Sequence, residues 1–109
     1  MSKAIDLVQH CTTMEDVRRN VNALDDILVP LLVERGGYMT QAAKVKNNPE
    51  LVRDEERIET IVSRVRERAA LEGGQPDVIE AIYRAMMEAY IAYEHRELAR
   101  LQAGGKPRE

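Results

Sequence analysis

The chain has 109 residues, a formal net charge of −3 and no Trp or Phe. This length is enough for one domain with a modest core, and the abundance of Leu, Ala, Glu and Arg favours helix. Charges of both signs are interspersed, which argues against a nucleic-acid or membrane-binding patch. The single cysteine, Cys11, cannot form an intrachain disulfide, which fits a reducing compartment. No apolar run suits a signal peptide or a membrane span, so we expect a soluble cytoplasmic protein.

Residues 13–47 carry apolar side chains at helical spacing, which predicts one long helix. The apolar row consists of Val17, Val21, Leu24, Ile27 or Leu28, Leu31 or Leu32, Met39, and Ala42 or Ala43. Thr12 or Thr13 can cap the start of the helix, and Asn47-Asn48-Pro49 ends the pattern. At roughly 1.5 Å per residue this helix is about 50 Å long, which is too long for a compact monomer of this size.

Two features interrupt the long helical pattern. Pro30 removes a backbone donor, and Gly36-Gly37 is a weak point in any helix. The segment is therefore either a single kinked helix or two helices with a break near residue 30 or 36. We favour the single kinked helix.

Two further helices complete the pattern. Residues 54–72 begin with an acidic turn, carry a narrow apolar stripe and end at Gly73-Gly74. Pro76 opens the third helix, which we expect to reach about Gln102. A frayed tail follows from Gly104. We therefore expect residues 1–109 to form one all-α domain, a three-helix protomer with its core at about 13–102.

The third helix is apolar around most of its circumference. Glu80, Arg84 and Glu88 are four residues apart and predict one solvated stripe with favourable pairing. The remaining positions between Val78 and Tyr93 are dominated by Ile, Ala, Met and Tyr, which predicts burial on more than one side. A three-helix monomer does not easily provide this burial. With the overlong first helix, it predicts an intertwined homodimer.

Charged side chains also occur at helical spacing within apolar stretches. These residues are Arg18, Arg35, Lys46, Arg57 and Glu94. Arg35 and Lys46 share a helix face about 16 Å apart along the axis, so their long side chains can converge on one small anion. Arg18 lies about 25 Å from Arg35 along the helix, so only the Arg18 of a partner chain can reach that anion. The alternative for each arginine is a surface residue whose charged end reaches solvent.

Glu94 lies on an apolar helix face with Tyr83, Met87 and Tyr90, at spacings of 4, 3 and 4. We expect a carboxylate on such a face to be harder to ionise than a solvated one, so that it can act as a neutral hydrogen-bond donor. There are two alternatives. Glu94 is solvent-exposed because it lies near the end of its helix, or it pairs with a nearby arginine.

With this pattern the chain resembles the all-helical bacterial chorismate mutases and the related isochorismate pyruvate lyases, over residues 14 to about 98. The segments that carry the resemblance are Val17-Arg18-Arg19-Asn20-Val21-Asn22-Ala23-Leu24-Asp25, Leu31-Leu32-Val33-Glu34-Arg35, Lys46, Val52-Arg53-Asp54, Glu56-Arg57 and Met86-Met87-Glu88. The resemblance implies a three-helix protomer that dimerises by intertwining, with two active sites built from both chains. It also implies chorismate mutase activity in aromatic amino acid biosynthesis.

The resemblance assigns a role to each charged residue. Arg18 from the partner chain, with Arg35 and Arg57 from the home chain, would bind the substrate carboxylates. Lys46 would contact the second carboxylate and the ether oxygen whose bond breaks, and Glu94 would be the second donor to that oxygen. The rearrangement needs no nucleophile, metal or proton transfer, so we expect no cofactor.

Three other positions complete the expected substrate-binding set. Asp54 would bind a ring hydroxyl through its backbone, and Ile58 and Tyr90 would line the site. Ile58 stands where mutases usually have Glu, and Tyr90-Ile91-Ala92 is shared with the lyases. Glu94 stands where the bacterial mutases usually have Gln, although the fungal mutases have Glu there. We favour a chorismate mutase; the alternatives are an isochorismate pyruvate lyase, which makes salicylate and pyruvate, and a helical dimerisation module without activity.

Overall fold

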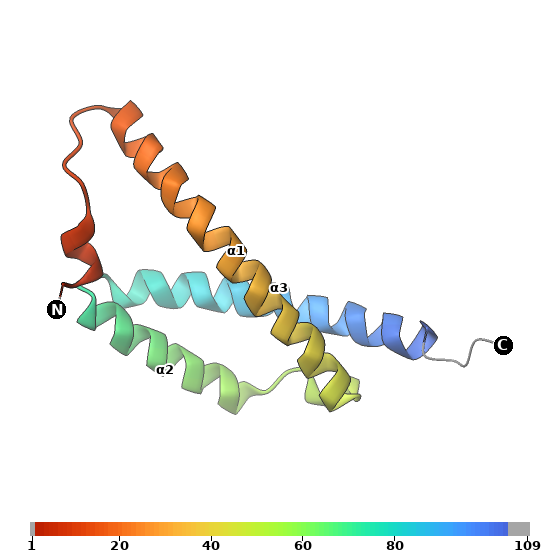
Figure 1. The fold of residues 1–109 in the computed structure, drawn as a ribbon. Coiled ribbons are helices and arrows are strands. Elements are labelled where there is room, and N and C mark those ends of the chain that lie inside the picture. Colours follow the sequence, from red (N-terminus) through yellow and green to blue (C-terminus); the bar gives the residue numbers. More distant parts are fainter. Residues whose placement is uncertain (1, 105–109) are drawn as a thin grey trace.

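The computed structural model describes residues 2–104, and every regular element in that range is helical. The 3₁₀ turn η1 (Ala4–Leu7) precedes the long helix α1 (Met14–Lys46). A second 3₁₀ turn, η2 (Pro49–Leu51), leads to α2 (Glu55–Leu71), and α3 (Pro76–Gly104) follows (Figure 1). The all-α class and the three predicted helices are confirmed. The two 3₁₀ turns were not predicted.

Helix α1 runs without interruption through Pro30, Gly36 and Gly37. The alternative of two helices is therefore wrong. Proline removes one helical hydrogen bond, to the carbonyl group of Asp26, four residues earlier. Asp26 and Pro30 are both exposed, so water can hydrate that carbonyl group and the helix continues.

The ends of α1 follow local sequence chemistry. The hydroxyl group of Thr13 accepts a hydrogen bond from the backbone N–H of Asp16 at 3.0 Å, so Thr13 rather than Thr12 is the N-cap. At the other end, Asn47 adopts a left-handed conformation with φ of 49°, and its N–H donates to the carbonyl group of Ala43.

The ends of α2 and α3 lie close to the predicted positions. Asp54 is the N-cap of α2, and α2 is followed by Gly73 with φ of 79°, a conformation that glycine adopts without strain. Helix α3 continues through Gly104, two residues beyond the predicted end and into the first residue of the expected tail. The rest of that tail, residues 105–109, lies outside the described residues.

Helices α2 and α3 pack side by side, and the C-terminal half of α1 crosses α3 (Figure 1). Two small clusters of buried side chains hold this arrangement, and Ile91 of α3 packs against both. One cluster consists of Ala43, Val52 and Leu98, and the other consists of Ile58, Val62 and Met87. The core therefore lies at the crossing of the three helices.

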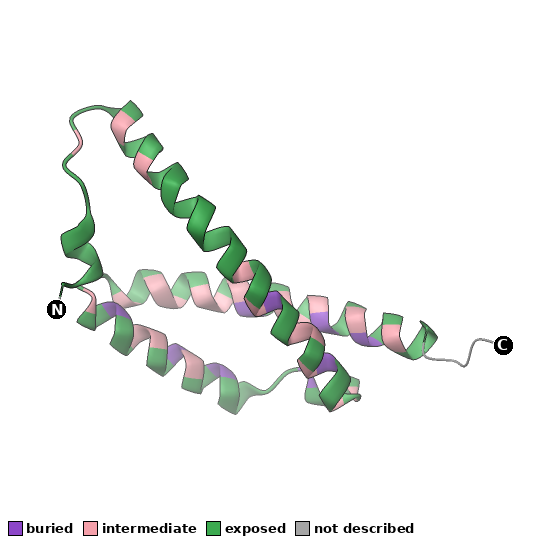
Figure 2. Cartoon of the chain, viewed as in Figure 1, coloured by how far each residue is buried: buried purple, intermediate pink, exposed green. Residues whose placement is uncertain are grey.

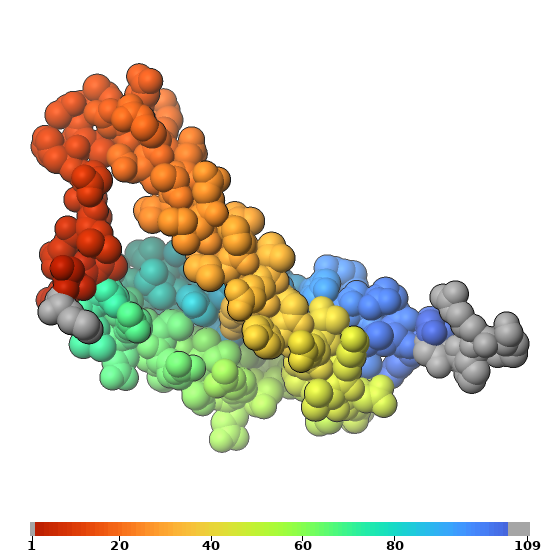
Figure 3. All heavy atoms as spheres, viewed as in Figure 1, coloured from red at the N-terminus to blue at the C-terminus, as the bar shows by residue number. Residues whose placement is uncertain are grey.

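The N-terminal half of α1 extends away from this core (Figures 2 and 3). Its predicted apolar row is exposed, from 37% at Val17 to 65% at Leu24. The segment that precedes α1 leads to the connection between α2 and α3, where the N–H of Ile5 donates to the carbonyl group of Glu72 at 3.1 Å (Figure 1). The protomer is elongated, with extents of 62 × 30 × 23 Å.

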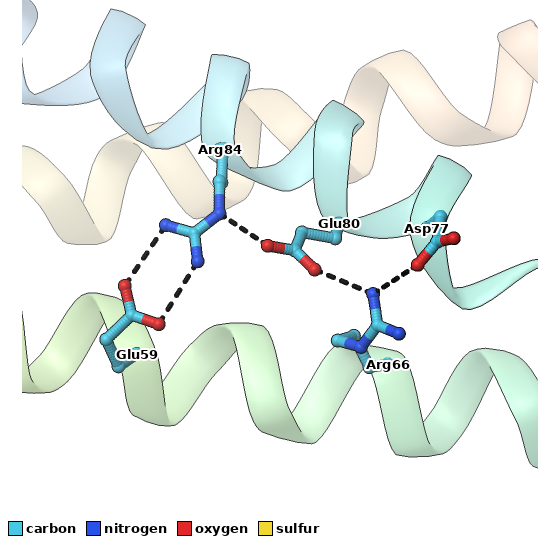
Figure 4. Close-up of polar contacts among 5 residues, drawn as sticks. All are labelled: Glu59, Arg66, Asp77, Glu80 and Arg84. Atoms are coloured by element: carbon cyan, nitrogen blue, oxygen red, sulfur yellow. Dashed lines mark hydrogen bonds and ion pairs between the residues drawn. The ribbon is translucent and has the colours of Figure 1, made fainter.

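Ion pairs join α2 to α3 along one seam (Figure 4). Arg84 binds both carboxylate oxygens of Glu59 at 3.1 Å and donates through Nε to Glu80 at 2.7 Å. Arg66 donates through Nη1 to Glu80 and to Asp77, both at 2.7 Å. The two guanidinium groups, Arg84 first, hold the pKa of the Glu80 carboxyl below its usual value.

The prediction of a solvated, internally paired stripe of Glu80, Arg84 and Glu88 is therefore only partly correct. The pair of Arg84 with Glu80 is confirmed. The prediction that the whole stripe faces solvent is wrong, because the side chain of Glu80 is only 26% exposed. Glu88 is exposed, but it pairs with Arg53 and not with Arg84. The reason is that α2 lies alongside this face of α3 and supplies Arg66, while Arg53 comes from the segment before α2.

Candidate active site

A pocket of about 280 Å³ lies where the C-terminal half of α1, the start of α2 and the middle of α3 meet. It is lined by Arg35, Met39, Ala42, Lys46, Val52, Asp54, Arg57, Ile58, Ile61, Met87, Tyr90, Ile91 and Glu94. Charged groups thus converge on a cavity whose other walls are mostly apolar. Small-molecule sites commonly have this composition.

Helical periodicity explains how two of the walls form. Arg35, Met39, Ala42 and Lys46 follow one another at spacings of 4, 3 and 4 along α1, which places them on one face. Met87, Tyr90 and Glu94 share a face of α3 in the same way. Because α1 crosses α3 at this point, the two faces enclose the pocket between them.

Lys46 and Glu94 meet across the pocket. Lys46 Nζ lies 3.4 Å from Glu94 Oε1 and donates to the carbonyl group of Val52 at 3.2 Å. Glu94 is 3% exposed, so the alternative that it is solvent-exposed is wrong. Its partner is Lys46 and not an arginine. The buried position of Glu94 agrees with the prediction that it faces inward.

The start of α2 presents the third cationic residue. Asp54 Oδ1 accepts from the backbone N–H of Arg57 at 2.9 Å, and the Asp54 carbonyl group accepts from the N–H of Ile58 at 3.0 Å. These bonds hold the first turn of α2 so that Arg57 and the buried Ile58 both line the pocket. The cap therefore sets the direction of two pocket residues.

The positive charges of the pocket are only partly compensated. Within residues 2–104, neither Arg35 nor Arg57 forms an ion pair with a carboxylate, and Lys46 pairs only with Glu94. Arginine guanidinium groups bind carboxylates in a bidentate geometry. The arrangement can therefore bind a small anion with an apolar body.

The structure brings together every predicted site residue except Arg18. Arg18 is exposed on the N-terminal half of α1 and does not line the pocket. Sequence reasoning missed six wall residues: Met39, Ala42, Val52, Ile61, Met87 and Ile91. The 4, 3, 4 spacing could have revealed Met39 and Ala42, whereas the carbonyl group of Val52 carries no sequence signal.

The fold and the pocket thus define an all-helical protein in which three cationic side chains line one pocket. Residues 17–95 match the family model described as chorismate mutase type II, and the chain belongs to this family. Membership supports chorismate mutase-type activity, an isomerisation, at the level of the family. Comparison with curated proteins yields no significant match.

No helix within residues 2–104 is long and apolar enough to cross a lipid bilayer. The same range contains no cluster of three or more His, Cys, Asp or Glu side chains arranged to hold a metal ion.

Proposed function

We propose that the protein is a chorismate mutase, which converts chorismate to prephenate in the biosynthesis of aromatic amino acids. The observation that carries this proposal is the convergence of Arg35, Lys46 and Arg57 on one pocket in a chain of the chorismate mutase type II family. The substrate is a small dicarboxylate, and the two arginines have no carboxylate partner within residues 2–104. We also place the enzyme in the cytoplasm, on the argument from its single cysteine.

The reaction is a pericyclic rearrangement, so the protein acts by holding one conformer and stabilising charge. Binding both carboxylates in the folded diaxial conformer removes the entropic cost of reaching it. Negative charge develops on the ether oxygen as its bond breaks, and preorganised donors at that oxygen lower the barrier. A pocket with fixed cations at both ends is suited to both tasks.

We assign the roles as follows. Arg35 and Arg57 bind carboxylates, and Lys46 contacts the second carboxylate and the ether oxygen. Glu94 is the second group at that oxygen, to which it can donate only when it carries a proton, and the 3.4 Å between its Oε1 and Lys46 Nζ supports a location of both groups at one end of the pocket. The remaining members of the set line the pocket: the Asp54 backbone binds the ring hydroxyl, and Ile58 and Tyr90 contact the ring.

We further propose that the active unit is an intertwined homodimer in which Arg18 reaches the pocket of the partner chain. The exposed apolar row of α1 supports a second copy, because contiguous exposed apolar surface marks an interface. An apolar groove of about 430 Å³ between η1, α2 and α3 offers further surface to be covered. A second copy that covers the apolar row of α1 and this groove would bury α3 on more than one side.

One observation favours a second candidate, isochorismate pyruvate lyase. Ile58 is buried and lines the pocket, whereas mutases have at this position a Glu that accepts a hydrogen bond from the ring hydroxyl. An apolar wall there cannot accept that hydrogen bond. Elimination of pyruvate from isochorismate is also pericyclic and acts on a near-isomeric dianion, so the same cations would serve it.

One assay tests these proposals together. The purified protein is incubated with chorismate and separately with isochorismate, and prephenate, salicylate and pyruvate are measured. We expect prephenate from chorismate at a rate far above the uncatalysed one. Salicylate and pyruvate from isochorismate as the dominant activity would make the protein a lyase. No turnover of either compound by the folded dimer would leave the helical dimerisation module as the function.

A further inference from the structure

The Arg35 guanidinium group is held by two aromatic rings of α3. Its central carbon lies 5.9 Å from the centroid of the Tyr83 ring and 5.8 Å from that of the Tyr90 ring. A cation over the face of an aromatic ring at this distance is attracted by the ring quadrupole. Because Arg35 has no carboxylate partner within residues 2–104, the electrostatic attraction that holds its guanidinium group comes from the two ring faces.

The position of the Tyr90 ring is itself fixed by α1. Tyr90 Oη donates to the carbonyl group of Leu32 at 2.6 Å, three residues before Arg35 on the same helix. The Tyr93 ring contacts it edge-on at 6.2 Å, and Tyr93 Oη is hydrogen-bonded to Thr40 Oγ1 at 2.7 Å. The ring that contacts Arg35 is thus tied back to the helix that carries Arg35.

Gly36 is the residue that allows this close approach. It is buried, and a Cβ atom at this position would lie 2.9 Å from Tyr90 Cε1 and 3.0 Å from Tyr90 Oη. A side chain at Gly36 would therefore displace the ring or break its bond to Leu32. The neighbouring Gly37 differs, because a Cβ atom there would meet nothing within 4 Å.

We propose that Gly36 and Tyr83 are positioning residues for Arg35. Gly36 leaves the space in which Tyr90 reaches Leu32, and Tyr83 and Tyr90 together hold the Arg35 guanidinium group towards the pocket. This inference rests on the proposed function, in which Arg35 binds a substrate carboxylate. It adds residues that do not themselves contact the substrate.

Gly36→Ala and Gly37→Ala form a matched pair of variants. Each adds one methyl group at neighbouring positions of α1, and alanine is the better helix former at both. We expect Gly36→Ala to raise KM for chorismate roughly tenfold with little change in kcat, which is the size of a lost cation–π contact. Gly37→Ala should keep both constants. Equal effects of the two variants would overturn the role of Gly36.

Tyr83 is tested by a second pair, which does not depend on the packing at Gly36. Tyr83→Phe keeps an aromatic face for Arg35, whereas Tyr83→Leu keeps apolar bulk without it. We expect a raised KM for Tyr83→Leu and near-normal KM for Tyr83→Phe. A similar KM for the two variants would show that the Tyr83 ring does not position Arg35.

A spectroscopic readout separates this inference from the proposed function. In the folded wild-type protein, the Arg35 δ protons should resonate upfield of ordinary arginine values because of the two ring currents, with Arg35→Lys used to assign the signals. Gly36→Ala and Tyr83→Leu should reduce that shift, and Gly37→Ala should not. An ordinary shift in the wild type would overturn the positioning inference even if the protein is active. A large shift without turnover of chorismate or isochorismate would overturn only the proposed function.

Discussion

At the scale of single residues, the proposed mechanism gives different roles to cationic side chains that carry the same charge. Lys46 lies at the Glu94 end of the pocket, and Arg35 lies eleven residues earlier on the same helix face. In the proposed mechanism, Lys46 meets the charge that develops on the ether oxygen in the transition state. Arg35 and Arg57 would instead meet carboxylates whose charge hardly changes during the reaction.

This difference predicts unequal costs of substitution. Lys46→Ala should lower kcat by about 10²- to 10³-fold, as expected for the loss of one donor to a developing negative charge. Arg57→Ala should act mainly on KM, because it removes an interaction present in the ground state and in the transition state alike. Steady-state kinetics with chorismate checks both. A Lys46→Ala enzyme with altered KM and intact kcat would show that Lys46 only binds substrate.

Substitution of Glu94 tests its role at the ether oxygen. Glutamine is a neutral hydrogen-bond donor of the same shape, whereas an ionised Glu94 would place negative charge where more is building. Glu94→Gln should therefore keep or raise kcat for chorismate, which steady-state kinetics measures. An inactive variant would mean that the charge of Glu94 is needed.

At the scale of the elements, ion pairs supplement the apolar contact between α2 and α3. The seam of Glu59, Arg84, Glu80, Arg66 and Asp77 runs along both helices, and Glu80 accepts from two arginines (Figure 4). Networks of this kind contribute more than isolated surface pairs. Their contribution depends on the ionised state of the carboxylates.

The network predicts loss of stability in acid. The pKa of Glu80 is lowered in the folded state, chiefly by Arg84, so its contribution is present above the ordinary glutamate value of 4.5. This contribution disappears as pH falls from 4.5 through the lower folded-state pKa. Glu80→Gln should therefore be less stable than wild type at neutral pH, with a difference that shrinks in this acidic range. Urea unfolding at several pH values measures it.

Glu67→Gln is the control for this experiment. Glu67 lies on α2, the helix that packs against the helix of Glu80, and within residues 2–104 it forms no ion pair. The same neutral substitution there should leave the pH dependence of the unfolding free energy close to that of wild type. A parallel pH dependence for Glu80→Gln and wild type would show that the network does not stabilise the protein.

At the scale of the whole molecule, the single protomer leaves much apolar surface without a partner. The N-terminal half of α1 extends from the core with Val21, Leu24 and Leu28 exposed by 48%, 65% and 49% (Figure 2). The same half carries Arg18, the predicted site residue that does not line the home pocket. A second copy would account for both facts at once.

Complementation tests the shared site. An Arg18→Ala chain and an Arg35→Ala chain should each show little activity as homodimers at chorismate concentrations below the wild-type KM, and mixing them should restore activity. In the heterodimer, one of the two sites receives Arg18 from one chain and Arg35 from the other. Subunit exchange is verified with differently tagged chains. Confirmed heterodimers without recovery of activity would contradict the contribution of Arg18 from the partner chain.

The sequence by itself was sufficient for the three helices and for the charged residues of the pocket. Helix ends follow local chemistry, so the start at Thr12 or Thr13, the acidic start of α2 and the stop at Asn47 could be predicted from neighbouring residues. The 3.6-residue period likewise places Arg35 with Lys46, and Tyr90 with Glu94, on one face each. These are properties of one helix and do not depend on what packs against it.

Only the tertiary structure decided what lies between helices. The pairing of Lys46 with Glu94, the bond from Lys46 to the Val52 carbonyl group and the approach of Tyr90 to Gly36 join residues far apart in the chain. The helical periodicity of one segment does not determine where another helix crosses it. The continuity of α1 through Pro30 was open for a related reason, because it depends on whether the freed carbonyl group faces solvent. That exposure is determined by the packing of the whole chain.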